Sequence, residues 1–252
     1  SSADLETALR EWGPCVVKSC HGGYDGRSQV RVQSADAAAD AWRALGERPA
    51  VAEQALDLER EISVMVARRP SGQTVAYPPA LNHHTNQVLS WSVLPAPLPS
   101  TLSARAGEVA VAIAHAAALE GLLGVEMFCT VGGDLFVNEL APRPHNSYHE
   151  SERACHTSQF EQFVRAICDL PLGDVAIVEP AAIVNLFGDL WRDGAMPDFS
   201  PALQLPGVRL HLYGKTSARP GRKMGHLSVT GTTPDGALTN IRAAAAAIGL
   251  VV

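Results

Sequence analysis

The sequence predicts an α+β fold built on antiparallel sheets. Segments in which apolar and polar residues alternate, as they do in strands, outnumber the segments with helical spacing, and many successive strands are separated only by short turns. A doubly wound parallel sheet would instead need strands and helices in regular alternation. With 252 residues, the chain can bury a sizeable core in one large domain or in two smaller ones.

Helices are expected where apolar residues recur at helical spacing or alanine dominates. Ser34 is a plausible N-cap, and Ser158 with Glu161 three residues later has the form of a capping box. Gly46 is expected to end the second helix, and Gly121 or Gly124 the third. The predicted helices cover residues 4–12, 34–45, 103–119, 158–170 and 236–248.

Strands are expected on both sides of a proline-rich segment at residues 95–99, which is the clearest boundary between two lobes. The predicted strands cover residues 15–19, 28–33, 50–56, 59–69, 74–77, 88–94, 125–131, 134–140, 182–187, 209–213 and 225–230. His83 and His84 are expected in a polar surface loop after a strand.

Composition excludes several classes of function. The formal net charge of −6 argues against broad binding of nucleic acids or anionic membranes. No apolar run approaches the roughly 20 residues of a membrane helix, and no signal peptide is visible. The five cysteines form an odd set without a C-x-x-C pair, which favours reduced thiols in the cytoplasm.

A glycine-containing loop lies within VVKSCHGGYDGRSQVRV, residues 16–32. Glycines between two strands can bring several backbone N–H groups to a phosphate without a side-chain clash, and Lys18 could add a positive charge. The pattern is neither a P-loop nor a Rossmann loop, because the glycines are not followed by a helix. An ordinary hairpin tip remains the alternative.

Two carboxylates are predicted to face each other in the hairpin of residues 125–140. If Gly132-Gly133 forms a two-residue turn, Glu126 lies directly across from Glu139. Carboxylates at a Cβ separation of about 5 Å repel each other. A Mg²⁺ ion shared with phosphates would relieve the repulsion, and Asn138 adds a further polar group. The alternative is a pair of glutamates that faces solvent.

Two irregular segments have the composition of binding loops. NELAPRPHNSYHES (138–151) combines prolines with many hydrogen-bonding side chains, which favours contact with a ligand over a zinc site at His145 and His149. YGKTSARPGRKMGH (213–226) concentrates positive charge at Lys215, Arg219, Arg222 and Lys223. These cations would repel one another without an anion, so a phosphate or carboxylate ligand is favoured over a merely solvated turn.

Taken together, these segments resemble the N5-carboxyaminoimidazole ribonucleotide synthases of purine biosynthesis, which belong to the ATP-grasp superfamily. The resemblance rests on GGYDGRSQ, VAEQAL with Glu61 following, VEMF with VNELAPRPHNS, TSQFEQFVRAICDLPLG and RPGRKMGHL, in unbroken order. It implies an ATP-grasp fold with a small β-rich C-terminal domain. The implied domains are a small lobe at 1–94, a large lobe at 95–178 and a C-terminal domain at 179–252.

The resemblance also implies a reaction. ATP would phosphorylate bicarbonate to carboxyphosphate, and the amine of aminoimidazole ribonucleotide would capture the carboxyl group. ATP as substrate, Mg²⁺, a cytoplasmic location and a homodimer are implied, with no nucleic-acid or membrane partner.

The same resemblance assigns residues. Nucleotide-binding positions match Lys18, Gly23, Tyr24, Asp25, Gly26, Arg27, Ser28, Gln29, Glu53, Gln54, Ala55, Leu56, Glu61, His84, Asn138 and Glu139. Positions that bind the ribonucleotide or the reacting carboxylate match Tyr24, Asp25, Arg143, His145, Asn146, Lys215, Arg222 and Lys223, with Asp25, Lys215 and Arg222 as the catalytic set. Metal-ligand positions match Glu126 and Glu139.

Some features depart from the family pattern. Ser28 and Tyr148 stand where the family usually has glycine, and the stretch from Lys215 to Arg219 is one residue longer than usual. The resemblance begins after the family's N-terminal Rossmann-like domain, which we expect to be absent from this chain. A truncated module that binds nucleotide without turnover is therefore one alternative. Another ATP-grasp ligase, such as formate-dependent glycinamide ribonucleotide transformylase, is a second.

Overall fold

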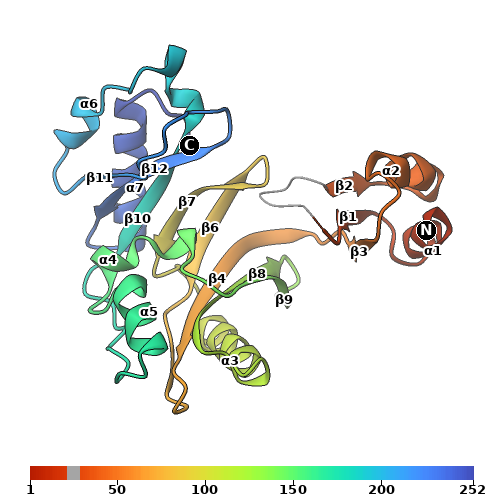
Figure 1. Cartoon of the computed structure of the whole chain (residues 1–252), viewed down its shortest axis with the longest axis horizontal. Coiled ribbons are helices and arrows are strands. Elements are labelled where there is room, and N and C mark those ends of the chain that lie inside the picture. The colour runs from red at the N-terminus through yellow and green to blue at the C-terminus, as the bar shows by residue number, and fades with distance from the viewer. Residues whose placement is uncertain (22–28) are drawn as a thin grey trace. The chain divides into compact units, whose positions relative to one another are not determined.

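The computed structural model describes residues 1–21 and 29–252 (Figure 1). Contacts divide the chain into two compact units. The first unit comprises Ser1–Leu58 with Thr85–Val88, and the second comprises Glu59–His84 with Leu89–Val252. Within the described residues, no helix is both long enough and apolar enough to cross a membrane. The three-part division into 1–94, 95–178 and 179–252 stays a prediction.

The first unit is a three-stranded antiparallel sheet with two helices. The strand order is β2-β1-β3, with β1 at Cys15–Ser19, β2 at Gln29–Val32 and β3 at Ala50–Gln54. Helices α1 (Ser2–Trp12) and α2 (Ala38–Ala44) contribute Leu5, Leu9, Ala38 and Ala41 to a core that includes Cys15 and Val17 of β1. Because Cys15 and Val17 point to one face, Val16 and Lys18 point to the other.

The second unit is built on a nine-stranded sheet. Eight strands follow the order β11-β12-β10-β7-β6-β4-β8-β9, and β5 pairs with β4. The strands are β4 Leu58–Arg68, β5 Thr74–Ala76, β6 Ala80–Thr85, β7 Val88–Leu94, β8 Gly121–Thr130, β9 Leu135–Ala141, β10 Ala181–Phe187, β11 Arg209–Leu212 and β12 Lys223–Thr230. The predicted class, α+β with antiparallel sheets, is confirmed.

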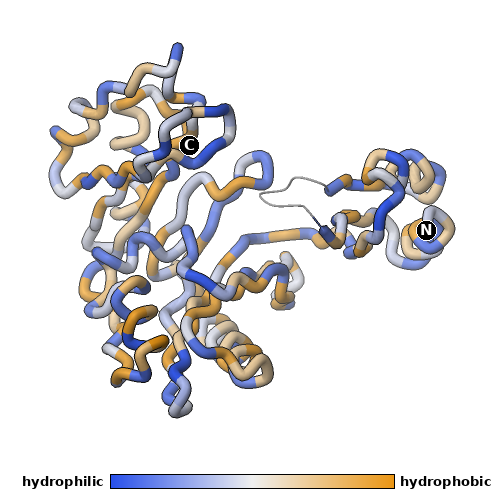
Figure 2. The backbone as a smooth tube through the Cα atoms, viewed as in Figure 1, coloured by the Kyte–Doolittle hydropathy of each residue, from blue (hydrophilic) through white to orange (hydrophobic). Residues whose placement is uncertain are grey.

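Helices and short turns complete this unit. They are α3 Ser100–Ala116, α4 Ser151–Ala154, α5 Gln159–Ile167, α6 Ser200–Leu203 and α7 Pro234–Ala247, with 3₁₀ turns at Asn146–Tyr148, Gly188–Leu190 and Arg192–Gly194. The first unit has a 3₁₀ turn of its own at Ala35–Ala37. Ala106, Ala110 and Ala114 of α3 pack on Val64 and Val66 of β4. Figure 2 shows that α3 and the neighbouring β8 are largely apolar.

The opposite face of the same strand belongs to another cluster. Met65 and Ala67 of β4 pack with Tyr148 and Ala166, which follow later in the chain. Both faces of β4 are therefore covered, which explains why this strand has a continuous apolar run instead of simple alternation. Helix α7 covers β10 and β12 through Ile241 and its alanines.

Two element predictions are wrong. Residues 80–85, including His83 and His84, form strand β6 and are not a loop, because β6 pairs with β4 in the middle of the sheet. Helix α3 begins at Ser100 and ends at Ala116, before Gly121 and Gly124, and both glycines lie in strand β8. In the turn between α3 and β8, Ala118 adopts the positive φ of 46° that a glycine was expected to supply.

Candidate functional site

The β8–β9 hairpin holds Glu126 and Glu139 opposite each other, as predicted. The predicted two-residue turn is wrong. Thr130 N–H donates to the Asp134 carbonyl at 3.0 Å, so residues 131–133 form a three-residue loop, with Gly133 in the left-handed region at φ 85°. This longer loop shifts the pairing near the tip, where Met127 lies opposite Val137.

A β-bulge at Asn138 restores the pairing. Between the pairs Met127–Val137 and Glu126–Glu139, β9 carries one residue more than β8, and that residue is Asn138. A bulge adds one residue and changes the direction of neighbouring side chains. The extra residue of the loop and that of the bulge compensate, so the glutamates end up opposed. Glu139 is exposed and Glu126 is largely covered.

Glu126 is paired with the first histidine of the 142–149 loop. The Nε2 atom of His145 lies 3.2 Å from the Glu126 carboxylate, and both side chains are at most 15% exposed. Burial alone would raise the pKa of Glu126, but the hydrogen bond and positive charge of His145, with His84 and Lys223 beyond it, lower the pKa below its ordinary value. Glu126 is therefore held as an anion.

The 142–149 loop is held by buried polar side chains. His145 Nδ1 and the Ser147 hydroxyl are 2.8 Å apart, and Ser147 in turn lies 2.8 Å from the Ser63 hydroxyl on β4. The side chain of Gln159 accepts from His145 N–H at 2.8 Å and donates to the His145 carbonyl at 2.9 Å. Both the ring and the backbone of His145 are thus fixed.

Tyr148, at the position where the resemblance expects glycine, is fully buried. Its hydroxyl lies 2.9 Å from the Ser63 carbonyl and 2.8 Å from the Pro78 carbonyl, and its ring meets Tyr77 edge-on. The hydroxyl has a single hydrogen to share between these two carbonyls. Tyr148 therefore anchors the loop in the core.

A second acid–base pair lies on β4 and β6. The Nδ1 atom of His84 is 2.6 Å from the Glu61 carboxylate, and the neighbouring pair Glu61–Asn82 fixes the register of these strands. Burial alone would lower the pKa of His84, but the contact with Glu61 and the charge of Glu126 raise it above its ordinary value. Lys223 acts in the opposite direction and lowers the pKa of His84, so the charges of both Glu126 and Lys223 act on this histidine.

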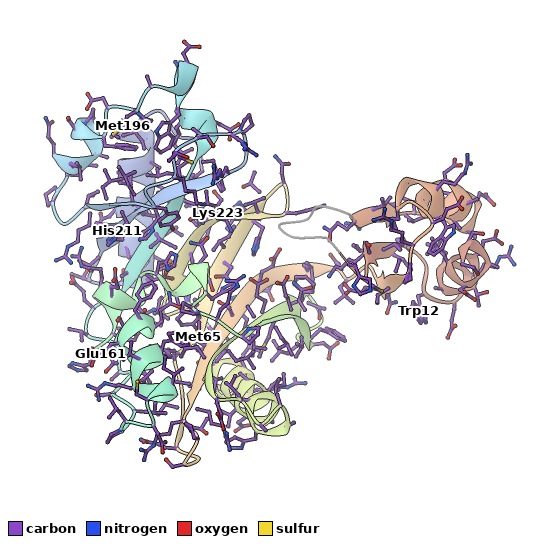
Figure 3. The ribbon with its side chains drawn as sticks, in the orientation of Figure 1. Trp12, Met65, Glu161, Met196, His211 and Lys223 are labelled. Atoms are coloured by element: carbon purple, nitrogen blue, oxygen red, sulfur yellow. The ribbon has the colours of Figure 1, made fainter. Side chains whose placement is uncertain are left out.

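The basic turn (residues 215–223) is closed upon itself. Lys215 Nζ donates to the Lys223 carbonyl at 2.5 Å, and Arg222 donates to both the carbonyl and the hydroxyl of Ser217 at 2.8 Å. Backbone oxygens thus offset part of the repulsion expected among these cations. Figure 3 labels Lys223 at the start of β12.

Gly188, after β10, holds the turn at its base. Its N–H donates to the Arg222 carbonyl at 2.8 Å, and a Cβ atom here would lie only 2.2 Å from the Arg219 carbonyl oxygen. Gly221 N–H donates to the Asp189 carboxylate at 2.7 Å. The backbone of the turn therefore has a fixed point of attachment.

In the first unit, the structure brings Lys18 and Glu53 together. Lys18 Nζ lies 2.6 Å from the Glu53 carboxylate, in agreement with the neighbouring pairs Val16–Glu53 and Lys18–Val51. Gln54 donates to the Trp12 carbonyl, and Ala55 N–H donates to the Pro14 carbonyl. Gln29 is the first residue of β2, opposite Lys18. Gly23, Tyr24, Asp25, Gly26, Arg27 and Ser28 lie outside the described residues.

Two known protein families match this sequence. The sequence model of the ATP-grasp domain matches residues 1–160, and that of the phosphoribosylaminoimidazole carboxylase C-terminal domain matches residues 181–239. The chain belongs to the ATP-grasp family.

Relatives of this ATP-grasp chain include the N5-carboxyaminoimidazole ribonucleotide synthase of Bacillus subtilis, at 40% identity over 226 residues. The match covers 89% of this chain and 58% of the relative, so the chain spans less than two thirds of that protein's length.

Solved structures are similar over almost the whole chain. The N5-carboxyaminoimidazole ribonucleotide synthetase of Thermus thermophilus has a TM-score of 0.88 at 33% identity, and the match covers 99% of this chain and 66% of that one. An N5-carboxyaminoimidazole synthase of Aspergillus clavatus, in complex with ADP and 5-aminoimidazole ribonucleotide, has a TM-score of 0.85 at 32% identity, covering 98% and 65%.

The carboxylates of this ATP-grasp chain fit a magnesium ion that is shared with phosphates. In the described part of the chain, no three His, Cys, Asp or Glu side chains gather closely enough to hold a metal by themselves. Mg²⁺ keeps several waters and is commonly bound by one or two carboxylates together with substrate phosphates. Two opposed glutamates, one of them a stabilised anion, are that kind of donor set.

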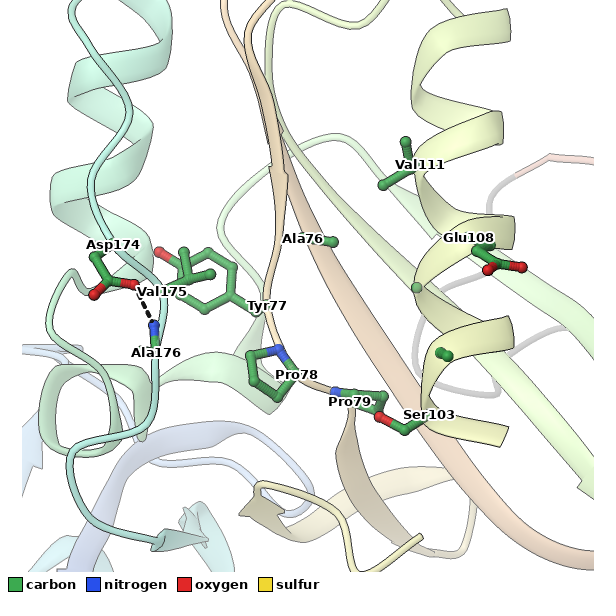
Figure 4. A pocket seen from close by; sticks show the side chains of 12 residues that line it. Ala76, Tyr77, Pro78, Pro79, Ser103, Glu108, Val111, Asp174, Val175 and Ala176 are labelled. Carbon is green, nitrogen blue, oxygen red and sulfur yellow. Dashed lines mark hydrogen bonds between the residues drawn. The ribbon is translucent and has the colours of Figure 1, made fainter. Parts of the chain in front are cut away.

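A hollow elsewhere in the second unit holds none of the predicted site residues. It has a volume of about 600 Å³ and lies between residues 76–79, helix α3 and residues 174–176. Figure 4 shows Tyr77 and Pro78 on one side and Ser103, Glu108 and Val111 of α3 on the other.

Sequence reasoning missed several residues that shape the site. Gln159 and Asn185 bond the loop from other segments, and two histidine rings from β11 and β12 stack with His149 of the loop. His149 and His226 have ring centroids 4.9 Å apart, and His226 and His211 are 4.5 Å apart. His149 is noticeable in the sequence because it lies four residues after His145. No local pattern marks the bonds and ring contacts of the other residues, because their partners are distant in the sequence.

Proposed function

We propose that this chain is the ATP-grasp part of an enzyme that carboxylates 5-aminoimidazole ribonucleotide with bicarbonate at the expense of ATP, giving N5-carboxyaminoimidazole ribonucleotide, ADP and phosphate. The observation that carries the proposal is the opposed pair Glu126 and Glu139 beside His145 and within the electrostatic influence of Lys223. The identity of 40% to a synthase of that name supports the substrate assignment.

The chemistry has two steps. A bicarbonate oxygen forms a bond to the γ-phosphorus of ATP while the bond to ADP breaks, which gives carboxyphosphate. The exocyclic amine of the ribonucleotide then forms a bond to the carboxyl carbon, phosphate leaves, and the amine loses a proton. In phosphoryl transfer the protein mainly positions groups and balances charge.

On the nucleotide side, each residue has a proposed role. By the resemblance, Lys18 and residues 23–29 would bind the nucleotide phosphates, and residues 53–56 would bind the adenine. Glu61, kept in place by His84 at 2.6 Å, accepts from the ribose hydroxyls. Glu126 and Glu139 would hold Mg²⁺, with Asn138 beside them. A bound magnesium ion would neutralise charge on the phosphates.

On the acceptor side, the proposed ligands are cations and hydrogen-bond donors. Arg143, His145 and Asn146 come from the 142–149 loop, and Lys215, Arg222 and Lys223 come from the basic turn. Lys215 and Arg222, with Asp25, form the proposed catalytic set. Lys215 donates to the Lys223 carbonyl and Arg222 to the carbonyl and hydroxyl of Ser217, and a phosphate or carboxylate would be a stronger, charged acceptor for either cation. A homodimer and a cytoplasmic location are part of the proposal.

The test is phosphate release from ATP, Mg²⁺ and bicarbonate, with and without aminoimidazole ribonucleotide. Release that the ribonucleotide stimulates supports the proposal. Nucleotide binding without any release would contradict it and would favour a module that binds without turnover. Glu139→Lys reverses the charge at a proposed metal ligand, so it should abolish the stimulated release, whereas Glu120→Lys on the same unit should retain it.

A further inference from the structure

Asn185 forms a reciprocal amide pair with Asn146. Asn146 Nδ2 donates to Asn185 Oδ1 at 3.0 Å, and Asn185 Nδ2 donates to Asn146 Oδ1 at 2.6 Å. Asn185 lies on β10, 39 residues further along the chain, and is fully buried. Asn146 is only partly buried.

A third hydrogen bond fixes the direction of this pair. Asn185 Nδ2 also donates to the Leu89 carbonyl of β7 at 2.8 Å. A backbone carbonyl can only accept, so the nitrogen of Asn185 must lie on that side. Its two N–H groups are then both used, one for Leu89 and one for Asn146. The oxygen of Asn185 consequently faces the nitrogen of Asn146, and the orientation of Asn146 follows.

This arrangement decides what Asn146 can offer a ligand. The amide nitrogen of Asn146 has two hydrogens, and the pair uses one of them. Among the described residues, the bonds of the Asn146 amide are the two with Asn185, which leave the other hydrogen for a ligand. Because the pair with Asn185 fixes the orientation of the Asn146 amide, Asn146 offers an N–H donor to a ligand. A flipped amide, which would offer only its oxygen, would break both bonds to Asn185.

We propose that Asn185 is a positioning residue that fixes Asn146 as a hydrogen-bond donor to an acceptor atom of the ribonucleotide. This inference rests on the proposed function, which places Asn146 among the ribonucleotide ligands. Two amides in a protein interior cost desolvation energy that an apolar pair of similar shape would avoid. A rigidly oriented donor is the property that the amide pair provides and that an apolar pair would lack.

Three variants test the proposal. Asn185→Leu removes both bonds to Asn146, so the KM for aminoimidazole ribonucleotide should rise roughly tenfold while the KM for ATP stays within about twofold. Asn185→Asp keeps the acceptor and loses both donors. The buried Asp carboxyl would regain one donor on protonation, so its ribonucleotide KM should fall as the pH is lowered. Asn240→Asp is the matched control, because Asn240 bonds only the Thr230 carbonyl at the surface of α7.

A second readout does not depend on activity. The side-chain amide signals of Asn146 in an NMR spectrum, assigned by their loss in Asn146→Leu, should shift in Asn185→Leu and stay in place in Asn240→Asp. If wild-type chain shows no stimulated phosphate release, the proposed function fails and the NMR comparison still decides the pairing. Unchanged amide signals in a folded Asn185→Leu, or an unchanged ribonucleotide KM in an active one, would overturn the inference.

Discussion

The 142–149 loop and the basic turn are both irregular segments of the second unit, and they are held in different ways. Buried side chains from other elements hold the loop, with Gln159 bonding the backbone of His145 and Asn185 bonding Asn146. The turn is exposed over much of its length and is closed mainly by its own backbone oxygens. The 142–149 loop therefore depends on side chains distant in the sequence for its conformation, whereas the basic turn depends mainly on bonds within itself. If both bind the ribonucleotide, as proposed, the loop would be held in place before binding and the turn would adjust.

Replacing Gln159 should have the largest effect on the stability of the 142–149 loop. Gln159→Leu leaves the buried N–H and carbonyl of His145 without their partners and also removes the 3.0 Å contact with His149 Nδ1, which should reduce the free energy of unfolding by about 2–4 kcal/mol. It should also raise the KM for the ribonucleotide. Urea denaturation and steady-state kinetics measure the two effects.

Gln162→Leu is the matched control for this change. Gln162 makes the same two bonds with Gly173, accepting from its N–H at 2.8 Å and donating to its carbonyl at 2.9 Å. The control should lose similar stability and keep its ribonucleotide KM. Equal changes of KM in both variants would show that the loop senses only general destabilisation.

Adding a methyl group at Gly188 should displace the turn with a smaller effect. In Gly188→Ala the new Cβ atom would lie 2.2 Å from the Arg219 carbonyl oxygen, so the turn must shift, at a cost of about 1–3 kcal/mol. We expect the ribonucleotide KM to rise by roughly fivefold, less than the effect of losing a buried hydrogen-bond pair. Gly107→Ala on α3 has open space and should leave the KM as it is. An unchanged KM in Gly188→Ala would mean that the position of the turn does not matter for binding.

The last effect is a dependence of stability on pH, and it concerns the stacked histidines. His149 of the loop stacks there with His226 of β12, which stacks with His211 of β11. Burial lowers the pKa of His226 to about 3, and the positive charges of His149 and His211 act in the same direction. Tyr213 faces the same ring, with its hydroxyl 2.9 Å from Nδ1. The pKa of His226 is thus lower in the folded protein than in the unfolded chain, where it is about 6.5. Neutral His226 therefore contributes its full stability above that pH, and the free energy of unfolding decreases as the pH falls below it.

His226→Gln should therefore flatten the dependence of stability on pH. Between about pH 6 and pH 4, the slope of the unfolding free energy should decrease by up to about 1.4 kcal/mol per pH unit relative to wild type. The comparison with wild type cancels the opposite contribution of Glu150, whose pKa burial raises to about 8. His156→Gln changes an exposed histidine and is the control. Equal slopes in wild type and His226→Gln would refute the prediction.

The sequence predicted well what depends on local pattern. The two units' main strands and helices follow from alternation and capping, and Ser158 does accept from Glu161 N–H at 3.2 Å. The opposition of Glu126 and Glu139 was also predicted, although the turn that was used to derive it is different. Two deviations of one residue each compensated, and no local signal reveals either of them.

What could not be predicted depends on contacts between distant segments. Tyr148 raised a doubt at a position where glycine is usual, yet its hydroxyl bonds a carbonyl 85 residues away and its ring fills the core. His84 was expected in a loop because its neighbours are polar, and its strand is recognisable only by pairing with β4. The partners Gln159 and Asn185 become visible only once the chain is folded.

The bulge at Asn138 has a consequence for how this hairpin would respond to a deletion. A chain without this residue would continue from Val137 to Glu139 in regular alternation, and Glu139 would still lie opposite Glu126. Deletion of this residue would therefore remove the polar side chain of Asn138 while leaving the two acidic positions in register. The hairpin keeps the geometry of the glutamate pair separate from the presence of the amide beside it, so the contribution of each can be measured without disturbing the other.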